Sequence, residues 1–450
     1  MKPGELLETI RGILGKVDVE EAVASVRGVE AWMNRFAENR VTVSKSWRLM
    51  EGVVYLVEGK RSLGFEISNI QPEAVEKAIL HAARLVKNAP ESDVKPILHA
   101  GPTQYGEQSL GYDPGILELV DGSVDMVEEA VNAASREGAR KTSGVLTFGK
   151  GSRLIYTTTG CEGSEQSTFI EFSVRAFYDE ESTGQSVRCG SSRRDVDASE
   201  IGEEAGRTAW NARNPRKAKP GVYDVAFKPC AMANLLNSVG ESASAYAAEI
   251  GLSYFKGLKG LKVASNIVTL WDDPRNPRSP VTSLFDDEGR PTCRFSIIER
   301  GVLKSYLHTS KTAQRLGEDP TGNAYFSTSV GDMVPAARTL IMDPGDVRED
   351  ELIKELNDGV LIHNLWYTRF QNYATGDFST MPRDGVFLVR SGEVVKPLKG
   401  LRLSDNMVRL LSAVKRVSVE RTWVKWWETD VPVLTPSCVV GGVRLTKPTK

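Results

Sequence analysis

The sequence predicts an α+β protein, in which an N-terminal domain mixing helices with an antiparallel sheet precedes a mainly β C-terminal domain. Three observations lead to this prediction. Helix and strand patterns alternate through the first half, and strand patterns dominate the second half. Between them, RNPRKAKPGVYD (residues 213–224) combines two prolines with several charges, which is typical of a solvated linker. Because 450 residues exceed one usual domain, we expect domains at 1–215 and 221–450.

The first elements are an amphipathic helix, short strands and a second helix. The opening segment places apolar residues at helical spacing, and strand patterns follow within 29–43 and 53–57. Residues 71–88 then carry a second apolar helical stripe, at Val75, Ile79, Ala82 and Val86. The next segment, 89–115, contains four prolines and predicts a long irregular connection across the surface.

The rest of the first half predicts a helix, a set of strands and a closing helix. The helices are expected at 124–137 and 201–213, and the strands at GVLTF, RLIYTT, STFIEFSVRAF and GQSVRC. In the third of these strands apolar residues alternate with Glu171, Ser173 and Arg175, which predicts a sheet with one wet face.

The second half predicts many strands and few helices. Hairpins are indicated where short Gly-containing turns join two strand patterns, in VFLVR-SGE-VV and FSIIE-RG-VLKSY. Helices are expected near 231–254, 349–357 and 406–414.

Composition excludes several classes of function. Lys and Arg number 57 and Asp and Glu 59, so the net charge of −2 argues against a nucleic-acid partner. Five scattered cysteines do not form a disulfide framework, and no apolar run is long enough to span a membrane. The N-terminus does not resemble a secretory signal, and we expect a cytoplasmic protein. There are four histidines and no two lie within ten positions, so a local zinc motif is absent.

Three groups of residues could carry chemistry. Asp286, Asp287 and Glu288 could bind a divalent cation, although solvated turn residues are the simpler interpretation. Thr375-Gly376-Asp377 could present a carboxylate to a cleft through an Asx turn. Within residues 423–427, aromatic side chains lie on both sides of Lys425. A packed or interface aromatic cluster is favoured over a surface that stacks the bases of a nucleic acid.

Several segments, in this order and spacing, resemble the TldD/PmbA family, whose members carry the name modulators of DNA gyrase. They are LGF (63–65), GVYDVAFKPCAMANLL (221–236), SLFDDEGRPT (283–292), IIERGVLKSYLHTSKTAQRLG (297–317), TGDFST (375–380) and GVFLVRSGEVVKPLKGLRLSDNM (385–407). The resemblance implies a C-terminal domain of the TldD/PmbA metallopeptidase type. It also makes Asp286, Asp287, Glu288, Thr375 and Asp377 candidate cleft residues.

In that family, TldD-like chains resemble zinc peptidases with HExxxH on a helix after the domain junction and a late Cys ligand. TldE- or PmbA-like chains lack the motif and pair with the first kind. The corresponding positions here are Ser242, Ala243 and Ala247, on a helix flanked by the carboxylates Glu241 and Glu249. Serine and alanine supply neither a strong zinc ligand nor a general base. Whether Cys438 matches the metal Cys stays open.

The resemblance therefore implies a TldE-like, non-catalytic subunit of a heterodimeric zinc peptidase that cleaves small or unfolded peptides. It implies no metal or catalytic residue in this chain, zinc in the partner, and a TldD-like HExxxH paralogue as partner, or a second copy of itself. The alternatives are a homodimeric hydrolase with an atypical site at Asp286, Asp287, Glu288, Asp377 or Cys438, or a binding protein that modulates gyrase. Whether the chain is itself an enzyme stays undecided.

Overall fold

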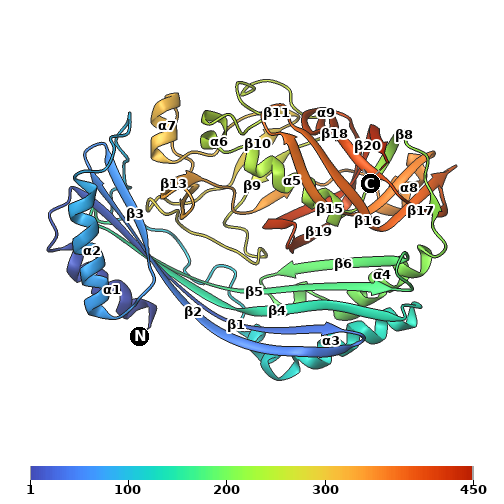
Figure 1. The fold of residues 1–450 in the computed structure, drawn as a ribbon, viewed down its shortest axis with the longest axis horizontal. Coiled ribbons are helices and arrows are strands. Elements are labelled where there is room, and N and C mark those ends of the chain that lie inside the picture. Colours follow the sequence, from blue (N-terminus) through green and yellow to red (C-terminus); the bar gives the residue numbers. More distant parts are fainter. Residues whose placement is uncertain (1, 448–450) are drawn as a thin grey trace.

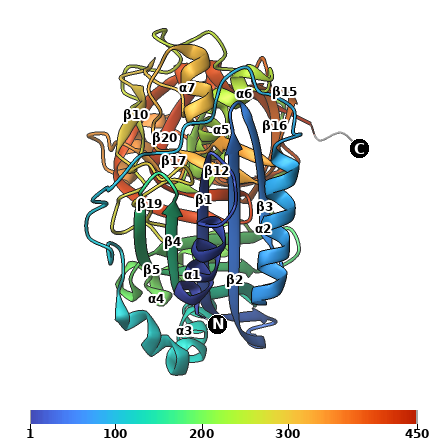
Figure 2. The ribbon, with the colours of Figure 1, turned by 90° about the vertical axis from the view of Figure 1, so that its left-hand side faces the viewer.

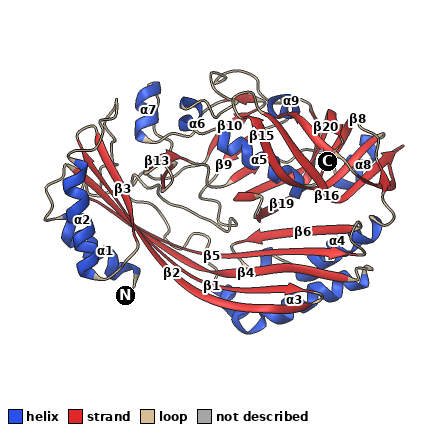
Figure 3. Cartoon of the chain, in the orientation of Figure 1, coloured by secondary structure: helices blue, strands red, loops and turns tan. Residues whose placement is uncertain are grey.

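The computed structural model describes residues 2–447 and confirms the α+β fold. A curved six-stranded antiparallel sheet, in the order β3-β2-β1-β4-β5-β6, forms the N-terminal part, and a twelve-stranded mixed sheet forms most of the C-terminal part (Figures 1 and 3). Both chain halves meet across the concave face of the first sheet (Figure 1).

The first sheet is built from long strands. They are β1 (Glu21–Ala37), β2 (Arg40–Glu58), β3 (Arg61–Ile67), β4 (Lys141–Thr157), β5 (Glu162–Phe177) and β6 (Thr183–Gly190). The short strand segments predicted within 29–43 and 53–57 belong to one long hairpin, β1–β2. Its turn residues, Glu38 and Asn39, have φ of 51° and 64°, the left-handed backbone of a tight hairpin turn. The separate strands predicted at GVLTF and RLIYTT are one strand, β4.

Two pairs of helices cover the same face of this sheet. They are α1 (Pro3–Leu14) with α2 (Pro72–Val86), and α3 (Leu119–Arg136) with α4 (Ala198–Asn211); a short 3-10 turn, η1 (Pro114–Glu118), leads into α3. One apolar cluster joins α1 and α2 to residues such as Val26 and Leu56, and a second joins α3 and α4 to Phe148 and Phe172. Figure 2 shows these helices beside the strands of the sheet. The predicted stripe of α2 is confirmed.

The opposite face of the sheet packs against the C-terminal half. Tyr55 and Ile155 share an apolar cluster with Phe285 and Phe326. The expectation of a wet face on β5 is therefore wrong in part, because Glu171 is paired with Lys425 and Arg175 Nε lies 2.8 Å from Asp384. Between the two halves, Glu171, Lys425 and Arg175 are half-buried and Asp384 is buried.

The C-terminal half is mainly β. Its strands are β7 (Arg216–Lys217), β8 (Gly221–Phe227), β9 (Leu270–Asp272), β10 (Phe295–Glu299), β11 (Val302–Leu303), β12 (Ala324–Ser327), β13 (Asp332–Pro335), β14 (Leu340–Met342), β15 (Gly359–Asn372), β16 (Asp377–Arg390), β17 (Glu393–Lys399), β18 (Arg402–Asn406), β19 (Val414–Trp426) and β20 (Thr429–Thr446). Both predicted hairpins are confirmed: β10 pairs with β11 around Arg300-Gly301, and β16 pairs with β17 around Ser391-Gly392.

Helices of the C-terminal half are short, apart from one that forms its centre. They are α5 (Pro229–Ser242), α6 (Ala245–Glu249), α7 (Ser310–Leu316), α8 (Glu349–Leu356) and α9 (Met407–Ser412). Nearly every residue of α5 is buried, because strands and loops surround it. The single helix predicted near 231–254 is wrong, since α5 and α6 are separate.

The Pro-rich connection between α2 and η1 is irregular, as predicted, and it touches the C-terminal half. The Ile97 N–H donates to Ser310 Oγ at 3.0 Å, and Tyr105 Oη donates to the carbonyl of Gly289 at 2.6 Å. Within residues 2–447, the structure has no helix with the length and apolar character needed to cross a membrane.

Candidate functional site

The three positions aligned with the zinc motif lie where α5 gives way to α6. Ser242 is the last residue of α5, Ala243 caps it, and Ala247 belongs to α6. The expected unbroken helix is interrupted because the backbone here pairs with Leu307 instead. Leu307 N donates to Ala243 O at 2.8 Å, and Ala245 N donates to Leu307 O at 3.1 Å.

This junction is packed rather than open. Ser242 is 4% exposed and Ala243 is fully buried. Ser253 Oγ donates to the Ser242 carbonyl at 2.6 Å, and the neighbouring Tyr254 is buried as well. Neither serine nor alanine side chains are zinc ligands of useful strength. Among residues 2–447, no three His, Cys, Asp or Glu side chains form a group that could hold a metal ion.

The carboxylates that flank this junction are engaged in local contacts. Glu241 Oε1 accepts a hydrogen bond from Asn237 Nδ2 at 2.9 Å. Glu249 forms an ion pair of 2.7 Å with Arg315 of α7. The two carboxylates therefore contact different elements.

Thr375 and Asp377 lie beside the same junction, in an exposed turn. Asp377 accepts hydrogen bonds from Thr375 Oγ1 at 2.6 Å and from Asn406 Nδ2 at 3.0 Å, and these bonds lower its pKa. Gly376 has φ of +81°, and a Cβ on it would lie 3.1 Å from Tyr254. The Asx-type bonds of this turn are made by Asn372, whose Oδ1 accepts from Ala374 N and Thr375 N, and not by Asp377, which begins β16. Tyr254 follows Ser253, which donates to the α5–α6 junction, and so connects the turn to it. The carboxylate of Asp377 fixes the start of α9 through Asn406.

The acidic turn lies elsewhere, between the first sheet and α7. Asp286 is fully buried, and Glu288 is 1% exposed, so the interpretation as solvated turn residues is wrong for both. Asp286 Oδ1 accepts from the backbone N–H groups of Glu288 and Arg290, and Oδ2 accepts from Ala324 N. Burial raises the pKa of Asp286. This carboxylate ties two loops together.

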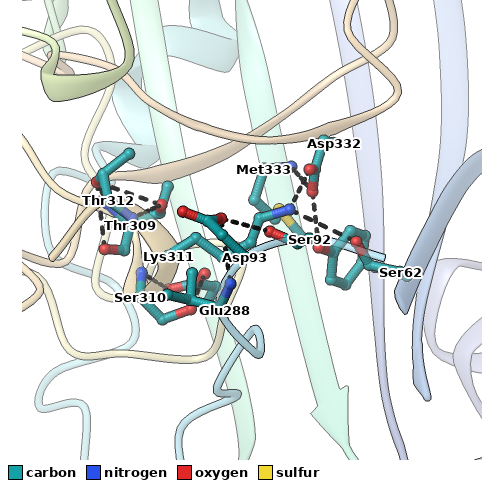
Figure 4. A network of polar contacts seen from close by, with 12 residues as sticks. Ser62, Ser92, Asp93, Glu288, Thr309, Ser310, Lys311, Thr312, Asp332 and Met333 are labelled. Carbon is teal, nitrogen blue, oxygen red and sulfur yellow. Dashed lines mark hydrogen bonds and ion pairs between the residues drawn. The ribbon is translucent and has the colours of Figure 1, made fainter. Parts of the chain in front are cut away.

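Glu288 belongs to a polar network that Figure 4 shows from close by. Its two oxygens accept from the backbone N–H and the hydroxyl of Ser310, at 2.8 and 2.7 Å (Figure 4). Beside it, Lys311 forms an ion pair with Asp332, and Asp332 also accepts from Tyr55 Oη at 2.6 Å. Burial, and then the charge of Asp286, raise the pKa of Glu288.

The third acid of the turn, Asp287, faces an arginine whose side chain is only 14% exposed. Arg153 of β4 forms ion pairs with Asp287 and with Glu165 of β5, the latter at 3.3 Å. Arg153 also donates to the Phe285 carbonyl at 2.8 Å. Asp287 Oδ2 in turn accepts from Phe326 N at 2.8 Å. Asp287 thus joins the acidic turn to the first sheet, and each of the three carboxylates accepts hydrogen bonds at both of its oxygens.

Sequence reasoning missed the partners of the acidic turn. Arg153 and Glu165 belong to two long strands, and Lys311 and Asp332 are 21 positions apart, so no local motif marks them. The one available signal was that Arg153 interrupts a strand pattern beside Leu154 and Ile155.

Two further candidates have ordinary packing roles. Cys438 is buried, with Sγ 4.0 Å from Met342 Sδ, and burial raises its thiol pKa. Trp423 and Trp426 are buried while Trp427 is 53% exposed. Trp426 and Trp427 pack with Trp366 at centroid distances of 5.7 and 5.3 Å, as expected for a packed cluster.

Comparison with known proteins places these features in one family. Residues 220–447 match the model of the PmbA/TldA metallopeptidase C-terminal domain, and residues 116–212 match that of the central domain. A metalloprotease of Methanothermobacter thermautotrophicus is 30% identical over 226 residues, which is 49% of this chain and 48% of that protein. The chain thus spans about half the length of that relative. A metalloprotease TldD homolog of Buchnera aphidicola from Schizaphis graminum is 22% identical over 89% of this chain and 85% of its own.

Solved structures share the whole fold. A Thermotoga maritima protein that carries the name modulator of a DNA gyrase superposes with a TM-score of 0.84 at 23% identity, over 98% of this chain and 100% of its own. TldE from Thermococcus kodakarensis also gives a TM-score of 0.84, at 21% identity and with the same coverage.

Proposed function

Because this chain belongs to the PmbA/TldD family of metallopeptidases, we propose that it is the non-catalytic, TldE-like subunit of a two-chain zinc peptidase. Its partner is a homologous chain that carries HExxxH and the zinc ion. The substrates are small or unfolded peptides, and the complex works in the cytoplasm.

The chemistry of one short segment carries this proposal. Zinc peptidases need nitrogen, sulfur or carboxylate ligands and a base that activates water. Ser242, Ala243 and Ala247 do not fit zinc, because they offer two methyl groups and one hydroxyl, and the segment 229–257 contains no histidine. This segment therefore supplies neither a zinc ligand set nor a general base.

What this chain supplies is a folded partner for the catalytic subunit. The ion pair between Asp287 of the acidic turn and Arg153 of β4 joins its two halves, and the exposed Thr375–Asp377 turn borders the α5–α6 junction. A peptidase must hold an extended substrate beside its metal, and a second chain can form the other side of such a cleft.

Mixing experiments test this proposal. The purified chain alone should cleave no unfolded peptide, such as reduced and alkylated casein fragments. Addition of a TldD-like HExxxH paralogue from the same organism should give cleavage that a chelator abolishes, at a rate above that of the paralogue alone. Chelator-resistant cleavage by this chain alone, lost in Asp287→Ala or Cys438→Ala, would instead support an atypical hydrolase.

A further inference from the structure

Half of strand β2 has a free edge. On one side β2 pairs with β1 along its whole length, from Arg40 to Val57. On the other side β3 pairs only with residues 52–58. Within residues 2–447, no strand pairs with the outer edge of β2 from Arg40 to Glu51 (Figure 2). Alternate backbone N–H and C=O groups along this stretch therefore point away from β1 and have no strand partner among the described residues.

This edge has a register shift at Thr42 and charged side chains at Lys45 and Arg48, but it has no proline. Proline, a bulge or inward-pointing charges commonly prevent such edges from pairing with other chains. The segment VTVSKSWRLM (41–50) contains no proline and no glycine, and its register against β1 is regular from Val43 onward. Every residue of 40–51 is exposed or half-buried. Residues 43–51 of β2 therefore form a regular, accessible strand edge to which another strand can hydrogen-bond.

The two faces of this stretch differ in character. Ser44 lies opposite Asn34 in β1, and Asn34 Nδ2 donates to Ser123 of α3, so the even-numbered residues share the helix-covered face. The odd-numbered side chains lie on the opposite face of the sheet. They form a row in which Val43 is 44% and Leu49 is 46% exposed, with Lys45 stacked over Trp47 between them.

We propose that this edge pairs, antiparallel, with the same edge of a second copy of the chain, about a two-fold axis at Ser46. A two-fold interface brings each patch against itself, so the strand must be self-complementary. With the axis at Ser46, Val43 faces Leu49, and Lys45 faces Trp47. Both pairs occur twice and lie on one face, where apolar and cation–aromatic pairs are favourable.

Neighbouring registers are worse, and this selects the axis. Residues that lie directly opposite each other in an antiparallel pair have their side chains on the same face of the sheet. The pairing can therefore shift only by two residues at a time, and each such shift moves the two-fold axis along the strand by one residue. An axis at Lys45 places two ammonium groups opposite each other, which is destabilising. An axis at Trp47 places Val43 opposite Glu51 and Leu49 opposite Lys45, so neither apolar side chain gains an apolar partner. The axis at Ser46 avoids both conflicts.

This inference concerns the chain by itself and does not depend on the proposed peptidase function. The two six-stranded sheets would form one continuous sheet across the axis, with their helix-covered faces on the same side. A failure to dimerise through β2 leaves the mixing experiment unaffected, and a failure of that experiment leaves this inference unaffected.

Site-specific crosslinking tests the register. Cys293 is the exposed native cysteine, so the tests use a Cys293→Ser background. In that background Ser46→Cys should form a disulfide-linked dimer on mild oxidation, because residues 46 of the two copies lie directly opposite, about 4.5–5.5 Å apart between Cα atoms. Ser44→Cys is the matched control. In the proposed register, the thiols introduced at position 44 of the two copies would lie four residues apart along the paired strands. This separation is about 13 Å, which is too far for a disulfide.

Sedimentation of the uncrosslinked protein tests whether the exposed row of odd-numbered side chains on β2 contributes to the dimer interface. The parent chain should dimerise at micromolar concentration, and Val43→Asp should weaken that dimer by about tenfold or more. Val394→Asp is the control, because Val394 is a strand residue of nearly equal exposure, 47% against 44%. A monomeric parent chain, or a dimer that neither crosslinks at 46 nor responds to Val43→Asp, would overturn the proposal.

Discussion

Replacing Arg153 with Met should destabilise the protein far more than removal of an exposed arginine. Arg153 is 14% exposed and donates to Glu165 Oε1 at 3.3 Å, Ser283 Oγ at 3.2 Å and the Phe285 carbonyl at 2.8 Å, besides its bond to Asp287. Methionine preserves much of the volume and removes the charge. The partners Glu165 and Asp287 are only 9% and 14% exposed, so they would be left as buried carboxylates.

The expected cost follows from the burial of these partners. Breaking a buried ion pair by removing one partner typically costs about 3–5 kcal/mol. Arg48→Met is the matched control, since Arg48 also pairs with a glutamate across neighbouring strands, at 2.7 Å, but is 82% exposed. Such an exposed pair is worth about 0–1 kcal/mol.

Urea unfolding followed by tryptophan fluorescence measures both variants. Arg153→Met should lower the free energy of unfolding by about 3–5 kcal/mol, and the further changes Glu165→Gln and Asp287→Asn should recover part of this loss. An effect of Arg153→Met no larger than that of Arg48→Met would refute the conclusion that the acidic turn holds the two halves together.

Other parts of the candidate site give further expectations. Because burial raises the pKa of Glu288, the folded chain keeps a proton that the unfolded chain releases, so the free energy of unfolding should fall as the pH rises from about 5 to about 8. Glu288→Gln should flatten that fall, and an unchanged slope in urea titrations would count against the buried placement. Asp377→Ala removes two hydrogen bonds from an exposed turn, so it should cost about 1 kcal/mol in thermal unfolding, with Asp377→Asn closer to the parent. The triple variant Ser242→His, Ala243→Glu, Ala247→His should still bind far less than one zinc, because the remaining ligand and the supporting hydrogen bonds are missing; stoichiometric binding would contradict this.

Periodicity predicted most elements of the fold. The apolar stripe of α2 and the two-residue hairpin turns at Arg300-Gly301 and Ser391-Gly392 are local patterns, and all three are present. The full length of the β1–β2 hairpin was missed because the polar run Ser44-Lys45-Ser46 interrupts the alternation of apolar and polar residues. Only pairing with β1 keeps that segment extended.

The candidate site was predictable only in its local parts. The turn at Thr375–Asp377 could be foreseen from residue types, whereas the break between α5 and α6 comes from backbone pairing with Leu307, more than 60 positions away. Two side chains five positions apart on an unbroken helix point about 140° from each other. A ligand pair at 242 and 247 would therefore need a break of this kind.

The burial of the acidic turn could not be predicted either. Asp286, Asp287 and Glu288 read as a solvated turn because consecutive acids are costly to bury. The compensating groups come from distant elements: Arg153 from β4, Ser310 from α7 and the backbone of Ala324. Only the tertiary fold assembles these donors.

The most direct test of the proposed function is the zinc content of the purified chain, measured by elemental analysis. A silent subunit predicts far less than one zinc per chain when this chain is produced alone, and about one per heterodimer after production with an HExxxH paralogue. One tightly held zinc in the chain alone would contradict the account, because Ser242, Ala243 and Ala247 provide no ligand set for it.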